Sequence, residues 1–179
     1  MIKVLNTITV VCALSMLTAC GGKKDEGGDK AAGGDKAAAA DKGGEKKGGG
    51  AAEVVLTKLD NLKGSAPAGS KAEDGIVGGM MVKGPGLVAS IDVANDMVPK
   101  TLEEAQKDFS ETYQGVTNVK AEKLADGYIF TAENKGGMGT NYWVKSRREI
   151  GGKAYSCETN APKAEIQAGA LAFCKSLKK

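Results

Sequence analysis

The 179-residue sequence contains no histidine, and only 4% of its residues are aromatic. Histidine is the commonest general base at neutral pH and the commonest metal ligand. Its absence excludes histidine-based catalytic triads and leaves any metal site to carboxylates, cysteine or methionine. The charge is nearly balanced, with 25 basic and 22 acidic side chains. Because nucleic-acid-binding domains usually carry a strongly basic surface, we expect no nucleic-acid partner.

No other catalytic motif takes the place of histidine. The serines lack both the nucleophile-elbow and the Ser-x-x-Lys contexts. The run Gly136-Gly137-Met138-Gly139 is not a phosphate loop, because no Lys-Ser or Lys-Thr pair follows it. The methionines are irregularly spaced, which favours core filling over Cu(I) binding; they include Met80, Met81, Met97 and Met138. We therefore expect a protein that is not an enzyme and holds no metal.

The N-terminal residues form a secretory signal. A basic start, Met1 to Lys3, precedes an apolar run from Val4 to Leu17 that is shorter than the ~20 residues of a membrane-spanning helix. Small residues close the run, as is typical of a cleaved signal. It ends in Leu17-Thr18-Ala19-Cys20.

These four residues resemble the lipobox of bacterial lipoproteins. The resemblance implies cleavage between Ala19 and Cys20, a diacylglycerol on the Cys20 thiol and an acyl chain on its new amino group, with no other cofactor. Gly21, rather than Asp, follows the cysteine. By the enteric pattern this implies the outer membrane, with the protein facing the periplasm or the cell surface. The alternative is an ordinary signal peptide with a chance cysteine.

Residues 21–52 are almost entirely Gly, Ala, Lys, Asp and Glu, and Gly-Gly-Asp-Lys-Ala-Ala occurs at 27–32 and again at 33–38. Such a segment cannot bury enough apolar surface to offset its chain entropy, so we expect a disordered tether. As a flexible spacer it spans roughly 30 Å. The alternative is a Lys-rich contact with anionic envelope polymers.

The folded part is expected over residues 53–179. Apolar alternation and turn signals predict strands and loops, and a Thr101/Glu104 capping box opens a helix with Leu102, Ala105 and Phe109 on one face. A second helix follows Pro162. Strands are expected at 53–62, 76–82, 87–93, 116–124, 128–132, 141–150 and 153–159, with loops at 64–75 and 134–140. This order predicts an α+β domain with a largely antiparallel sheet.

From residue 87 onwards the arrangement resembles the PsbP/DcrB-like α/β/α sandwich. The residues that carry the resemblance are Thr101 to Glu104 at the start of the first helix, Gly151 to Tyr155 in the last hairpin, and Ser176 to Lys178 at the end of the last helix. The resemblance implies a sandwich fold. Members of that superfamily differ in activity, so it implies no particular function.

Two cysteines lie in the predicted domain. Cys157 shares a strand face with Tyr155, and Cys174 shares the apolar helix face of Ala170 and Phe173. A helix that folds back over the sheet brings the two together, and thiols oxidise readily outside the cytoplasm. We therefore predict a structural disulfide, which closes a loop of about 17 residues and contributes roughly 3 kcal/mol.

Trp143, Lys145 and Arg147 alternate along one strand and form a candidate ligand surface, because cations beside an aromatic ring can hold an anionic or aromatic ligand. The favoured interpretation is that Trp143 lies beneath a helix and that the basic residues are solvated. The sequence therefore favours a tethered interaction or structural module of the cell envelope, with an envelope protein or cell-wall partner. The alternative is a periplasmic domain for a small ligand or an anion.

Overall fold

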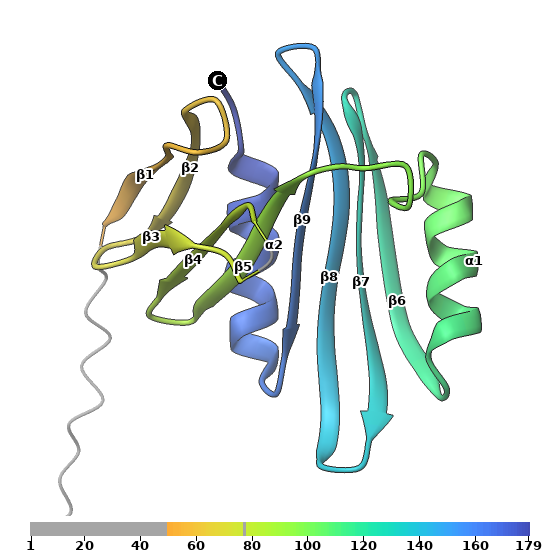
Figure 1. Ribbon diagram of the computed structural model, residues 1–179. Coiled ribbons are helices and arrows are strands. Elements are labelled where there is room, and N and C mark those ends of the chain that lie inside the picture. Colours follow the sequence, from red (N-terminus) through yellow and green to blue (C-terminus); the bar gives the residue numbers. More distant parts are fainter. Residues whose placement is uncertain (1–49, 77) are drawn as a thin grey trace, which may run out of the picture. The chain divides into compact units, whose positions relative to one another are not determined.

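The structure, a computed structural model, describes residues 50–76 and 78–179. The predictions for Ala19, Cys20 and nearly all of the tether fall outside this part. Within it, five strands, a helix, four strands and a helix follow one another (Figure 1), which confirms the α+β class. They are β1 Ala51–Leu56, β2 Leu62–Pro67, β3 Lys71–Asp74, β4 Met80–Gly84, β5 Leu87–Val93, α1 Leu102–Thr112, β6 Val116–Leu124, β7 Gly127–Gly136, β8 Gly139–Ile150, β9 Lys153–Ala161 and α2 Ala164–Ser176.

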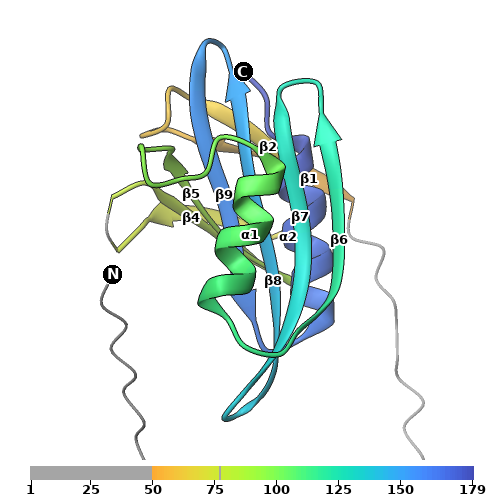
Figure 2. The same cartoon turned by 90° about the vertical axis from the view of Figure 1, so that its right-hand side faces the viewer.

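Seven strands form one sheet in the order β3-β4-β5-β9-β8-β7-β6, and every neighbouring pair is antiparallel. Helix α1 lies on one face of this sheet and α2 on the other (Figure 2). Strands β1 and β2 form a separate two-stranded sheet. This small sheet packs on α2 through β2, so α2 is covered on two sides.

The main core lies on the α2 face, because alternate residues of β5, β8 and β9 turn their apolar side chains to that side. Phe173 of α2 is fully buried and rests against Gly64 of β2, where a Cβ atom would come within 2.4 Å of the ring. Gly169 meets the backbone of Gly86, whose carbonyl oxygen would lie 2.0 Å from an added Cβ. Two glycines thus allow α2 to approach both the small sheet and the β4–β5 turn.

The predicted disulfide is confirmed. Cys157 of β9 and Cys174 of α2 are bonded, with Cα atoms 5.7 Å apart, and both side chains are buried in the core of the α2 face. The bond joins the last strand of the sheet to the helix that covers it. It spans 17 positions in sequence, as the loop expected from the spacing did.

The C-terminal end of α2 is held by Arg148 of β8. Its guanidinium donates hydrogen bonds to the carbonyl oxygens of Cys174 and Lys175, at 3.1 and 2.8 Å. It also donates to the Asp126 carboxylate at 2.6 to 3.1 Å. A cation at the helix C-terminus satisfies carbonyl groups that have no partner inside the helix and complements the helix dipole.

Helix α1 begins as the sequence predicts. The Thr101 side chain accepts a hydrogen bond from the Glu104 amide, and the Glu104 carboxylate accepts one from the Thr101 amide, which completes the capping box. Ala105 and Phe109 are buried against the sheet, with Leu102 and Tyr113 partly buried beside them. The predicted apolar face of this helix is therefore confirmed.

Four of the predicted segment assignments are wrong. The expected loop 64–75 contains most of β2 and all of β3. Strand β2 buries Leu62, Gly64 and Ala66 on alternate positions, and two of these are too small to give a strong apolar pattern. The first strand ends at Leu56 and begins at Ala51, inside the segment assigned to the tether.

The expected loop 134–140 is mostly strand. The ladder between β7 and β8 continues to the pair Gly136 and Gly139, so only a two-residue tip remains. Strand β4 begins at Met80 rather than at residue 76, and Ile76 is 92% exposed in the preceding turn. The methionines are only partly core residues: Met80 is buried, whereas Met97 is 85% exposed and Met138 lies fully exposed at the β7–β8 tip.

Candidate functional site

A second, smaller core lies between α1 and the sheet. Trp143 of β8 is 8% exposed, and its ring centroid lies 5.5 Å from Phe109 and 4.5 Å from Tyr113. Its indole N–H donates to the Asn134 side-chain oxygen at 2.7 Å, which satisfies the one polar group that this burial covers. Trp143 therefore lies beneath the helix, as the favoured interpretation of the sequence states.

The two basic residues of the same strand face each have an acidic neighbour. Lys145 forms an ion pair with Glu158 of β9, and its ammonium nitrogen lies 5.7 Å from the Trp143 ring centroid. Arg147 lies 3.4 Å from Glu149 and its side chain is only 15% exposed. The structure thus brings Trp143, Lys145 and Arg147 to one face, but it does not leave them as an open cationic surface.

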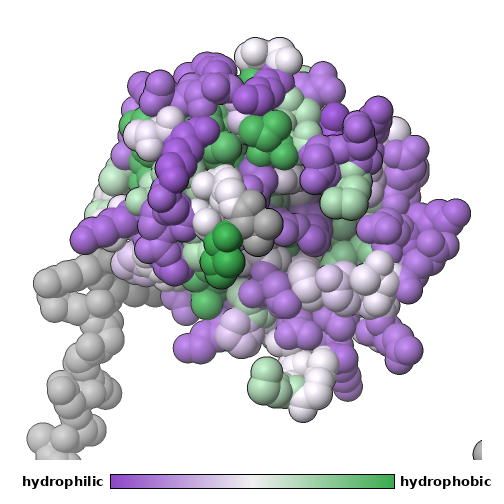
Figure 3. Space-filling view, in the orientation of Figure 1, coloured by the Kyte–Doolittle hydropathy of each residue, from purple (hydrophilic) through white to green (hydrophobic). Residues whose placement is uncertain are grey.

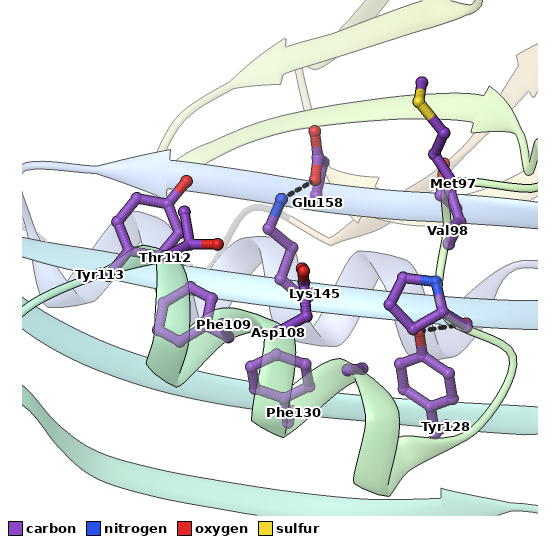
Figure 4. A pocket seen from close by; sticks show the side chains of 13 residues that line it. Met97, Val98, Asp108, Phe109, Thr112, Tyr113, Tyr128, Phe130, Lys145 and Glu158 are labelled. Carbon is purple, nitrogen blue, oxygen red and sulfur yellow. Dashed lines mark hydrogen bonds and ion pairs between the residues drawn. The ribbon is translucent and has the colours of Figure 1, made fainter. Parts of the chain in front are cut away.

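Beside this aromatic cluster the sheet and α1 enclose a cavity of about 220 Å³, which we call the α1 cleft. The cleft opens at the edge of α1, next to β9 and β5, which this helix does not cover. On this face β9 and β5 carry polar residues. Figure 4 shows the lining of the cleft. The lining residues are Met97, Val98, Pro99, Ala105, Asp108, Phe109, Thr112, Tyr113, Tyr128, Phe130, Lys145, Ser156 and Glu158.

One side of the α1 cleft is fixed by Tyr128. Its hydroxyl donates to the Pro99 carbonyl oxygen at 2.8 Å and so ties the β5–α1 loop to β7. Burial raises the pKa of Tyr128 to about 12, with Arg147 acting in the opposite sense. The phenol therefore stays protonated at neutral pH and serves as a fixed donor to the loop.

The charged groups of the α1 cleft are two carboxylates and one ammonium. Asp108 comes from α1, Glu158 from β9 and Lys145 from β8 (Figure 4). Asp92 of β5 lies near them, beside Ser156 in the sheet ladder. Burial, and then the charge of Glu158, raise the pKa of Asp92 above its ordinary value. The cleft and its border therefore carry an excess of negative charge.

An exposed apolar side chain stands at the mouth of the α1 cleft. Met97 lines the cleft and is 85% exposed. The face of the molecule drawn in Figure 3 is largely hydrophilic, with separate apolar spots. Single exposed apolar residues are common on protein surfaces, but Met97 is distinguished by its place in the lining of a cavity.

Sequence reasoning found part of this site and missed the rest. It identified Lys145 and the burial of Trp143, but it did not single out Asp108, Glu158 or Met97 as site residues. Strand alternation gives one usable signal for Glu158: it follows Cys157, so it faces the side opposite to the disulfide. Asp108 carried no comparable signal, because it lies among several acidic residues of one helix.

No family model matches this sequence, and a search of curated proteins finds no match. Neither helix in residues 50–76 and 78–179 is long and apolar enough to cross a membrane. In the same residues, no three Cys, Asp or Glu side chains gather in a way that could hold a metal ion.

Proposed function

We propose that this chain is a lipid-anchored protein of the bacterial cell envelope whose folded part is a non-catalytic docking module. The observation that carries the docking role is the α1 cleft with Met97 exposed at its mouth. A partner side chain that enters such a cavity while neighbouring residues cover the apolar rim forms the usual centre of a protein interface.

The size of the α1 cleft favours one side chain over a free ligand. Pockets for small molecules usually enclose about 300–1,000 Å³. The α1 cleft, at about 220 Å³, is smaller. Its aromatic walls are the observation that favours the alternative, a small-ligand or anion-binding domain, but the excess of carboxylates at the cavity disfavours an anion. A thermal shift on adding small anions or cell-wall fragments would support that alternative.

The chemistry of the α1 cleft supports binding rather than catalysis. Lys145 and Glu158 are committed to each other, and Tyr128, with a pKa of about 12, is too weak an acid to exchange protons at neutral pH. These groups fix the shape of the cleft and supply its charge. We therefore propose a module that acts through its partner.

The anchor and the fold family are separate parts of the proposal. The lipobox ending in Cys20 supports lipidation, and Gly21 supports the outer membrane. A central antiparallel sheet between α1 and α2 supports the likeness to the PsbP/DcrB-like sandwich. The β1–β2 sheet precedes residue 87 and so lies outside the part of the chain that carries this likeness.

The docking role is tested by photo-crosslinking in intact cells. A photoreactive amino acid replaces Met97 at the cleft mouth, or Met138 at the β7–β8 tip as a matched control, since both are exposed methionines. We expect a discrete cross-linked protein from position 97 and none from 138. Equal patterns from the two positions, or no product from 97, would refute docking at the α1 cleft.

The anchor is tested on the full chain by mass spectrometry. We expect the mature N-terminus at Cys20, carrying the mass of acyl chains, and loss of that mass in Cys20→Ser. An unmodified N-terminus at another residue would refute lipid anchoring, and it would leave the docking role intact.

A further inference from the structure

Helix α1 is acidic. Over 11 residues it carries four acidic side chains and one basic side chain, which is Lys107. Three of the four acids already have a partner. Glu103 pairs with Lys123 at 2.6 Å, Glu104 accepts hydrogen bonds from the amides at the helix start, and Glu111 lies 3.9 Å from Lys107.

Asp108 is the fourth acid, and it lines the α1 cleft. Within residues 50–76 and 78–179 it forms no ion pair. The second carboxylate of the cleft, Glu158, shares its charge with Lys145. One negative charge of the lining, on the exposed side chain of Asp108, therefore has no ion-pair partner in this part of the chain. The partly buried ring of Tyr113 lines the same cleft, so a cation there can meet both a carboxylate and an aromatic ring.

Resting on the proposed docking function, we infer that the partner is a protein that inserts an arginine side chain into the α1 cleft. Its guanidinium meets Asp108 and lies against the partly buried ring of Tyr113 in the cleft wall. A planar guanidinium makes paired hydrogen bonds to a carboxylate and stacks on aromatic rings, which an ammonium does less well. The exposed Met97 receives an apolar neighbour of that arginine.

The volume admits one such side chain. Space of about 10–15 Å³ is enough to hold one water molecule, and the α1 cleft offers about 220 Å³, so it has room for a side chain of several non-hydrogen atoms.

The test uses the full lipid-anchored chain in a non-ionic detergent. Trp143 is the one tryptophan of the sequence and contacts Tyr113, so its fluorescence reports on the α1 cleft. The probes are N-acetyl-arginine amide and the uncharged, nearly isosteric N-acetyl-citrulline amide. We expect a saturable change with the arginine probe, and about tenfold weaker binding of the citrulline probe, because the charge-assisted contact is lost.

Two variants make the charge test local. Asp108→Asn removes the carboxylate of the cleft, and Glu111→Gln removes one negative charge from the same helix at a side chain that is 67% exposed. We expect Asp108→Asn to weaken the arginine probe about tenfold and to reduce the cross-link from position 97, with Glu111→Gln unchanged in both. Equal effects of the two variants would show that the probe responds to the overall negative charge of the helix rather than to Asp108, and would overturn the inference.

The remaining outcomes separate this inference from the docking role. If position 97 cross-links a partner equally well in Asp108→Asn, docking stands and the arginine anchor is refuted. If the citrulline probe binds as tightly as the arginine probe, the cleft does not select charge, and the inference is refuted as well. If the arginine probe binds but position 97 yields no partner, the docking role falls and the inferred protein partner falls with it.

Discussion

The two faces of the seven-stranded sheet are built from alternate residues of the same strands, yet they differ in character. The α2 face is apolar, crossed by a disulfide and closed by a helix that a second sheet covers in turn. The α1 face is only partly covered and leaves the charged cleft of Asp108, Lys145 and Glu158 at the edge of its aromatic cluster. One face supplies most of the stability, and this leaves the other free to carry polar groups that stability alone does not require.

The largest expected effect compares one substitution on each face. Phe173→Ala should cost about 4 kcal/mol of unfolding free energy, because the fully buried ring fills the space between α2 and Gly64. Phe109→Ala should cost about 3 kcal/mol, since the space it leaves adjoins a cleft that water can enter. Urea titration of both variants measures the difference. A larger loss from Phe109→Ala would reverse the assignment of stability to the α2 face.

The next effect concerns the covalent link of the α2 face. Replacing Cys157 and Cys174 together by alanine should cost about 3 kcal/mol, the value for closing a loop of 17 positions in the unfolded chain. The double variant avoids a lone buried thiol. Urea titration in the presence and absence of reductant provides the control, because the variant should not respond to reductant. Thiol labelling of both cysteines in the unfolded, unreduced wild type would instead show that no bond forms.

The sequence predicts this face well because its signals are strong and local. Cys157 alternates with Tyr155, and Cys174 shares a helical stripe with Phe173, so period 2 and period 3.6 each assign one partner to the core. The prediction that Trp143 lies beneath a helix rested instead on the usual burial of tryptophan, and the contact with Phe109 of α1 confirms it. Where side chains are large and apolar, their spacing in the sequence predicts which side of a helix or strand is buried.

The parts of the structure that were not predicted lack large apolar residues at regular spacing. Strand β2 reads Leu62-Lys63-Gly64-Ser65-Ala66-Pro67, and the absence of a side chain at Gly64 leaves room for the ring of Phe173. Only the tertiary contact explains it. The α1 cleft is a similar case. It forms where α1, a helix of 11 residues, ends before it covers the whole sheet, and no single residue of the sequence marks that position.

A smaller effect is expected at the start of α1. Thr101→Ala should cost about 1 kcal/mol, because it removes the side-chain acceptor of the Glu104 amide at 3.2 Å. Amide exchange should accelerate in α1 and not in α2. Ser110→Ala, at an exposed position of the same helix, is the control and should change stability little. Faster exchange in both helices would mean that the two faces open as one unit.

Two aspartates give the comparison a pH dependence of opposite sign. Asp60 belongs to the α2 side, where the Tyr155 hydroxyl donates to it at 2.6 Å and Lys153 lies 3.2 Å away. The Tyr155 hydrogen bond first, and then Lys153, lower the pKa of Asp60. On the α1 side, burial and then Glu158 raise the pKa of Asp92.

A carboxyl group whose pKa is lowered on folding stabilises the fold above the unfolded pKa of about 3.9, and this stability is lost as the pH falls through the folded pKa. A raised pKa has the reverse effect, so Asp92 costs stability once the pH rises above about 3.9. We therefore expect Asp60→Asn to destabilise the protein at pH 7, with the difference from wild type shrinking towards pH 2.

Asp92→Asn should instead stabilise the protein at pH 7, by less than about 0.5 kcal/mol because the group is only partly buried, and the gain should vanish below about pH 4. Melting temperatures of wild type and both variants at pH 2, 4 and 7 measure the two trends. Asparagine matches aspartate in shape, so the packing beside Gly79 is retained and the charge is the one change. If both variants shifted stability in the same direction at pH 7, the negative charge of Asp92 would not lower the free energy of unfolding. The two faces of the sheet would then differ only in their apolar packing.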